Sequence, residues 1–127
     1  MVESSVPGIY RKSAIHPAAR TFQALRMEVN EEMKQLRETL NVVAESLLDK
    51  GRMSVISFHS GEDRLVKEYI FNQSRGCTCP PHLPFCVCGK KPQMKMITKK
   101  PIRPDTREIE QNVRARSARM RVAEKIA

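Results

Sequence analysis

The chain has 127 residues, a formal net charge of +9 and 40% hydrophobic residues. This length fits one ordinary domain. The chain has no run of 18 apolar residues and no signal-peptide pattern, which argues against a membrane-spanning or secreted protein. We therefore expect a cytoplasmic protein whose four cysteines are reduced thiols or metal ligands rather than disulfides.

The positive charge is concentrated near the C-terminus. Residues 90 to 127 hold 12 basic and 4 acidic side chains, whereas the preceding residues are nearly balanced. A local excess of Lys and Arg indicates a polyanion partner, with RNA or DNA favoured over a membrane surface. The alternative is a solvated and partly disordered tail.

Residues 1–15 show no period and are expected to form a leading loop or a truncated end. Over residues 16–50 the spacing predicts one long amphipathic helix, because apolar residues recur from Phe22 to Leu47 close to the period of 3.6. Pro17 near the start and Gly51 beyond the end agree with this prediction.

Polar side chains accompany the first half of this predicted helix. Arginine, glutamine and asparagine on one helix face can hold a phosphate or a base edge by directed hydrogen bonds. The alternative is a solvated face that has no ligand. The candidate substrate or RNA-binding residues are His16, Arg20, Gln23, Arg26 and Asn30.

Residues 52–75 predict a strand followed by a helix. The run MSVISF is rich in strand-forming residues, and we expect it to be a buried parallel strand. Ser60 is expected to cap the next helix, with Asp63 three residues later. The succession of helix, strand and helix indicates part of a parallel α/β sheet.

The junction between this strand and its helix is a second candidate site. Backbone N–H groups at such a junction bind anions or polar substrates, and His59 could accept a proton or donate a hydrogen bond there. The alternative is a capped helix whose acidic residues complement its dipole. The candidates are His59, tentatively catalytic, and Ser57, Ser60, Asp63 and Arg64 for binding.

Residues 76–92 form a loop rich in Cys, Pro and Gly. Its cysteines are Cys77, Cys79, Cys86 and Cys88, two Cys-x-Cys pairs that could close a tetrahedral structural zinc site. The spacing is unusual, because zinc ribbons generally place two or more residues between paired cysteines. Unligated reduced thiols remain an alternative, as does a redox or iron–sulfur role.

Residues 93–127 predict an edge strand near Met94 to Ile102, a short helix, a turn near Asn112 and a final basic segment that is helical or frayed. The planar guanidinium of arginine suits phosphate, since it binds two oxygens at once. The candidate RNA-binding residues are Lys99, Lys100, Arg114, Arg116, Arg119 and Arg121.

Several of these motifs occur together in one known family. HPAARTFQALR, VISFHSGEDR, CTCPP with CVCGKKP, ITKKPIRP and NVRARSARMR stand in the same order in the chain. In these motifs the chain resembles the bacterial 16S ribosomal RNA cytidine-N4 methyltransferases called RsmH or MraW, which use S-adenosylmethionine.

The resemblance implies an α/β fold, the C-terminal part of a Rossmann-like methyltransferase domain preceded by a helix from an inserted helical domain. It also implies that the chain lacks the cofactor loop, and that its partner is 16S rRNA in the small ribosomal subunit. We expect a fragment, a truncated gene product or half of a split enzyme, inactive alone and acting with a complementary half or as a homodimer. The competing hypotheses are a non-enzymatic RNA-binding module and an interaction protein that dimerises through the long helix.

Overall fold

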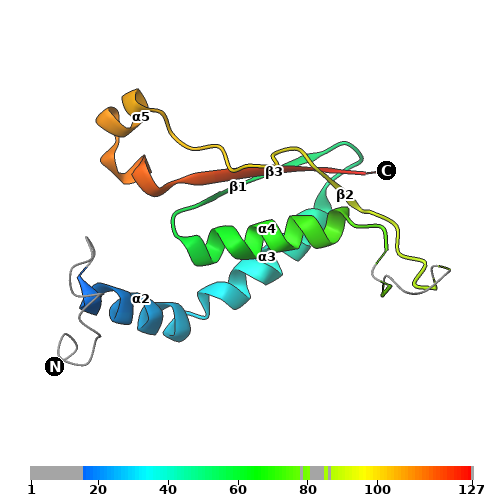
Figure 1. Ribbon diagram of the computed structural model, residues 1–127, viewed down its shortest axis with the longest axis horizontal. Coiled ribbons are helices and arrows are strands. Elements are labelled where there is room, and N and C mark those ends of the chain that lie inside the picture. Colours follow the sequence, from blue (N-terminus) through cyan, green and yellow to red (C-terminus); the bar gives the residue numbers. More distant parts are fainter. Residues whose placement is uncertain (1–15, 78, 81–84, 86, 127) are drawn as a thin grey trace. The chain divides into compact units, whose positions relative to one another are not determined.

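The computed structural model describes residues 16–77, 79–80, 85 and 87–126, and these fall into two compact units that meet in the sequence between residues 35 and 36. The expected leading loop over residues 1–15 lies outside the described residues. Among the described residues no helix is long and apolar enough to cross a membrane. The elements in chain order (Figure 1) are the helices α2 (Pro17–Val29) and α3 (Glu32–Ser46), strand β1 (Arg52–Ser57), helix α4 (Ser60–Ser74), strand β2 (Met94–Met96), helix α5 (Thr106–Gln111), the 3₁₀ helix η2 (Val113–Ser117) and strand β3 (Arg119–Lys125).

The prediction of one unbroken helix over residues 16–50 is wrong, because the helix breaks between α2 and α3. Asn30 caps the C-terminus of α2, and Glu31 adopts a left-handed backbone conformation with φ of 49°. Asn30 is a poor helix former and tolerates this kind of end. The guanidinium of Arg26 binds both carboxylate oxygens of Glu32, at 2.8 and 3.2 Å, and so bridges the break. The spacing of apolar residues alone could not reveal the break, because the same spacing continues from α2 into α3.

The second unit is built on a three-stranded sheet in the order β1-β3-β2. Both pairings are antiparallel, with Met53 opposite Ala123 in one and Met96 opposite Ala123 in the other. The prediction of a strand at MSVISF is confirmed, but within the described residues its only partner strand runs antiparallel, so the expected parallel pairing is not found here. The partner is the last strand of the chain, which the sequence analysis did not recognise as a strand.

Helices cover one face of this sheet. The buried core side chains come from α3, α4 and all three strands: Leu40, Ala44, Met53, Val66, Ile70, Met94 and Ala123. Burial alternates along β1, where Met53 and Ser57 are buried and Ile56 is 57% exposed. The alternation follows from the two-residue period of a strand, which turns successive side chains to opposite faces. The buried face of β1 therefore belongs to the packed core, and its other face is open to solvent in the described part of the chain.

The C-terminal segment agrees with its prediction only in part. An edge strand is present, but β2 ends at Met96 and Ile102 forms only an isolated bridge with Met120. A short helix is confirmed as α5, and the 3₁₀ helix η2 follows Asn112, where a turn was predicted. The final basic segment is neither helical nor frayed, because β3 is the central strand of the sheet. Its sequence RMRVAEK contains many helix formers, but burial of Ala123 and pairing on both edges outweigh that local preference.

Candidate functional site

His59 caps the N-terminus of α4. Its Nδ1 accepts hydrogen bonds from the backbone N–H groups of Gly61 and Glu62, at 3.2 and 3.3 Å. In return the Glu62 carboxylate accepts from the N–H groups of Phe58 and His59, at 2.9 and 3.2 Å. This is a capping box with histidine in the capping position. The prediction that Ser60 caps this helix is therefore wrong by one residue.

The capping box changes what the strand–helix junction can do. The backbone N–H groups expected to bind an anion there already donate to His59 and Glu62. These four N–H groups are therefore not available to an anionic ligand in this structure. Nδ1 of His59 is also occupied as an acceptor, so the ring hydrogen of the capping tautomer lies on Nε2.

Nε2 of His59 takes no part in the cap and is buried. It lies 3.3 Å from Oε1 of Glu62, but it makes no hydrogen bond to any residue in the described part of the chain. Glu62 is not among the predicted site residues, although it completes the capping box. The signal for it was available in the sequence, since a glutamate stands three residues after the capping position.

Asp63 accepts hydrogen bonds from two arginines of strand β3. Its carboxylate accepts from Nε and Nη2 of Arg121, at 2.7 and 3.1 Å, and from Nη1 of Arg119 at 3.3 Å. The hydrogen bond from Arg121 is the largest influence and lowers the pKa of Asp63 from its ordinary value, although burial acts in the opposite direction. Arg121 is 5% exposed and Asp63 is 8% exposed. Both side chains are therefore engaged inside the fold and are not exposed to RNA in this structure.

Two other predicted residues of this region differ in their surroundings. Ser57 is buried, and its hydroxyl donates to the carbonyl oxygen of Arg119 at 3.3 Å across the β1–β3 pair. Arg64 is exposed on the first turn of α4. Ser57 thus supports the position of β3, whereas Arg64 is accessible to a polyanion.

Exposed basic side chains gather in the segment between β2 and β3. Asn112 caps η2 by accepting from the N–H of Arg114 at 3.2 Å, and Ala115 anchors this helix by being buried. The side chains on either side of Ala115 are exposed and belong to arginines. Within this segment, four of the residues predicted to bind RNA are exposed: Lys99, Lys100, Arg114 and Arg116, which we name the basic segment.

The five candidates of the first unit lie on α2 or at its ends. His16 caps α2, with Nδ1 accepting from the N–H of Ala18 at 3.2 Å. Arg26 is paired with Glu32, and the Asn30 side chain also donates to Glu32 at 3.3 Å. The remaining two candidates, Arg20 and Gln23, are exposed and half-buried respectively.

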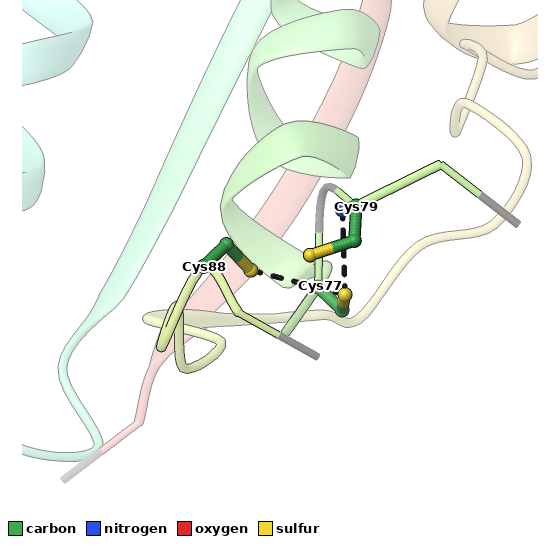
Figure 2. Close-up of side chains that lie close together, drawn as sticks. All are labelled: Cys77, Cys79 and Cys88. Atoms are coloured by element: carbon green, nitrogen blue, oxygen red, sulfur yellow. Dashed lines mark hydrogen bonds between the residues drawn. The ribbon is translucent and has the colours of Figure 1, made fainter. Parts of the chain in front are cut away.

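Three of the four cysteines lie together in the loop that follows α4. Figure 2 shows the side chains of Cys77, Cys79 and Cys88 gathered beside the end of that helix. Their sulfur atoms all lie within 4.8 Å of one another, and those of Cys77 and Cys88 are 3.8 Å apart. Cys86, the fourth predicted ligand, lies outside the described residues.

Comparison with known proteins gives a consistent result over nearly the whole chain. Residues 1–126 match the model of the MraW methylase family. The chain is 50% identical over 127 residues to "Ribosomal RNA small subunit methyltransferase H" of Lawsonia intracellularis, which covers 99% of this chain and 41% of that protein. It is 48% identical over 126 residues to the protein of the same name from Heliobacterium mobile. That alignment covers 99% of this chain and 40% of the relative.

These similarities place the chain among methylases, as the order of its motifs suggested. The chain belongs to the MraW methylase family. It spans about two fifths of the length of the curated relatives that it matches.

Proposed function

We propose that these 127 residues are the C-terminal portion of an S-adenosylmethionine-dependent methyltransferase that modifies N4 of a cytidine in 16S rRNA. The observation that carries this proposal is the identity of 50% and 48%, over 99% of the chain, to two proteins named as methyltransferases of small-subunit ribosomal RNA. Such an enzyme works in the cytoplasm, where its RNA substrate is found.

In this proposal the described residues bind and orient RNA and do not hold the methyl donor. The basic segment provides four exposed cations for phosphate oxygens, and Arg64 provides one at the start of α4. His59 is a positioning residue that fixes the start of α4 through its cap. The donor is held by residues beyond those described, in agreement with the occupied N–H groups at the junction after β1.

The test is methyl transfer from labelled S-adenosylmethionine to small ribosomal subunits that lack the modification. The chain is mixed with the part of the Lawsonia intracellularis relative that it does not align with, which is expressed separately. Labelled cytidine should form in the mixture and not with either piece alone. Because a failed mixture could mean failed assembly, co-purification of the two pieces is measured first; stable assembly without methyl transfer would contradict the proposal.

A second candidate function is a non-enzymatic RNA-binding module, which the exposure of the basic segment favours. It makes a different prediction in the same experiment, since RNA would be bound but never methylated. The hypothesis of an interaction protein assumed a single long helix as the dimer contact. That helix is not present, because α2 and α3 are separated at Glu31.

A further inference from the structure

The loop between α4 and β2 is tied at its base. The N–H of Gln93 donates to the carbonyl oxygen of Gln73 at 2.9 Å, and Nζ of Lys90 donates to the carbonyl oxygen of Asn72 at 3.0 Å. The backbone of Gly76 passes so close to Pro92 that an added Cβ would lie 3.3 Å from its Cδ. The two ends of the loop are therefore held together by contacts that involve no cysteine.

Just beyond this base, the three described cysteines have the spacing of ligands around a single metal ion. A zinc–sulfur bond of about 2.3 Å with tetrahedral angles sets the sulfur atoms about 3.8 Å apart. The sulfur atoms of Cys77 and Cys88 are 3.8 Å apart, and Cys79 completes a set in which no separation exceeds 4.8 Å. A cluster with several irons would separate its cysteine sulfurs further, because they bind different irons.

Packing does not account for these side chains. Cysteine without a ligand is one of the most buried residue types, because it behaves as a small apolar side chain. Here Cys77 and Cys88 are exposed and Cys79 is half-buried, and none of them belongs to the core. Their convergence at the surface therefore needs a cause other than burial.

The surroundings of the cluster favour anionic sulfur. The backbone N–H of Cys79 donates to Sγ of Cys77 at 3.4 Å, which is the kind of contact that orients and stabilises a metal-bound thiolate. Lys90 and Lys91 directly follow Cys88 and Gly89 in the chain, and Arg75 precedes the cluster. These residues add positive charge to the loop that carries the cysteines, and positive charge in the neighbourhood favours thiolates.

We propose that Cys77, Cys79 and Cys88 bind a structural zinc ion as thiolates. Each thiol gives up its proton to the solvent as its sulfur binds, so zinc affinity rises with pH. The ion is bound at the tied base of the loop and fixes the connection between α4 and β2. This site is independent of the proposed methyl transfer, and its role is to stabilise the fold.

The first experiment measures zinc in the whole chain, purified under reducing conditions, by elemental mass spectrometry. One zinc per chain is expected, and Cys77→Ser and Cys88→Ser should each lose it. The matched control is Val87→Ser, an exposed position in the same loop that should keep a full equivalent. A chain without zinc, a chain with an iron–sulfur chromophore, or cysteine variants that retain the full equivalent would overturn the proposal.

The second experiment avoids variants, since a cysteine variant could fail to fold. The zinc-loaded chain is titrated with a mercurial that blocks thiols, and released zinc is measured with a coloured chelator. Zinc should be released in proportion to the thiols blocked, to one equivalent. With cobalt in place of zinc, the chain should show the thiolate charge-transfer absorption and the intense visible bands of tetrahedral cobalt. Zinc that stays bound after all thiols are blocked, or octahedral cobalt spectra, would contradict thiolate ligation.

Discussion

The carboxylate of Asp63 accepts two hydrogen bonds from the guanidinium of Arg121, although the two residues are 58 positions apart in the chain. Asp63 lies on the first turn of α4 and Arg121 lies on the central strand β3. This pair therefore joins the helical layer to the sheet at the same place where His59 caps α4. It makes the position of the strand–helix junction depend on the last strand of the chain.

Replacing Asp63 by Asn should destabilise the second unit strongly. The amide keeps the shape but leaves the buried Arg121 guanidinium without its counter-charge, which costs about 3 to 5 kcal/mol. The measurement is the free energy of unfolding in urea at neutral pH. Glu124→Gln is the matched control, because it breaks the more exposed pair with Arg52 and should change stability little. Equal effects from the two variants would contradict the role assigned to Asp63.

The same carboxylate predicts how stability depends on pH. The pKa of Asp63 is lowered from 3.8, chiefly by the hydrogen bond from Arg121. A lowered folded-state pKa contributes stability that is fully present above the unfolded-state pKa and is lost as pH falls through the folded-state pKa. The unfolding free energy of the native chain should therefore decrease on acidification more than that of Asp63→Asn. A constant difference between the two from neutral pH down to strongly acidic pH would refute this linkage.

The cap on α4 predicts different results for two substitutions of His59. Ala removes the acceptor for the N–H groups of Gly61 and Glu62 and should cost about 1 kcal/mol, whereas Asn is itself a good N-cap and should cost little. Thermal unfolding of both variants measures this difference. In the reconstituted methyl-transfer assay, His59→Asn should retain more activity than His59→Ala, because Asn preserves the cap and the buried Nε2 donates no hydrogen bond within the described residues. Equal losses from the two variants would contradict a role through the cap.

The basic segment should contribute to RNA affinity in a salt-dependent way. Arg116→Gln is expected to weaken binding to 16S rRNA and to reduce the slope of log affinity against log salt by about 1, the loss of one phosphate contact. Lys95→Gln is the control, because it removes one exposed positive charge from the edge strand β2, outside the basic segment. If the two variants reduce the slope equally, binding follows net charge and not the basic segment.

The break between α2 and α3 can be tested by glycine substitution. Glu31 has a φ of 49°, a conformation that glycine adopts freely, so Glu31→Gly should leave stability unchanged or raise it by up to about 1 kcal/mol. Glu28→Gly lies inside α2 and should lower the helical circular dichroism signal and cost about 1 kcal/mol. A loss at Glu31 as large as that at Glu28 would indicate a continuous helix.

The local patterns of the sequence predicted some of these features well and others poorly. The strand at MSVISF and the edge strand at β2 were recognised because their side chains alternate or resist helix formation. The strand β3 was missed because the burial of its side chains depends on partners far away in the chain. The charge of Arg121 is compensated by the carboxylate of Asp63, which the local sequence does not show. A local sequence pattern does not predict a long-range ion pair, so Arg121 was predicted to be an exposed arginine of a basic tail.

For the candidate sites too, features that depend on local sequence were predictable and features that depend on the folded backbone were not. The exposed basic segment and the gathering of three cysteines could be predicted from composition and spacing. The role of His59 could not, since which ring nitrogen is occupied depends on the backbone of the turn that follows it. Glu62 completes that turn from a position where sequence reasoning had favoured its neighbour Asp63.

The central claim is that this chain completes a methyltransferase for 16S rRNA. The most direct measurement replaces the aligned residues of the Lawsonia intracellularis relative by this chain and expresses the hybrid in bacteria whose own enzyme has been deleted. Nucleosides from their 16S rRNA are then analysed by mass spectrometry. The account predicts that N4-methylated cytidine returns with the hybrid and not with the relative lacking those residues. A folded hybrid that binds small ribosomal subunits but leaves the cytidine unmethylated would contradict it.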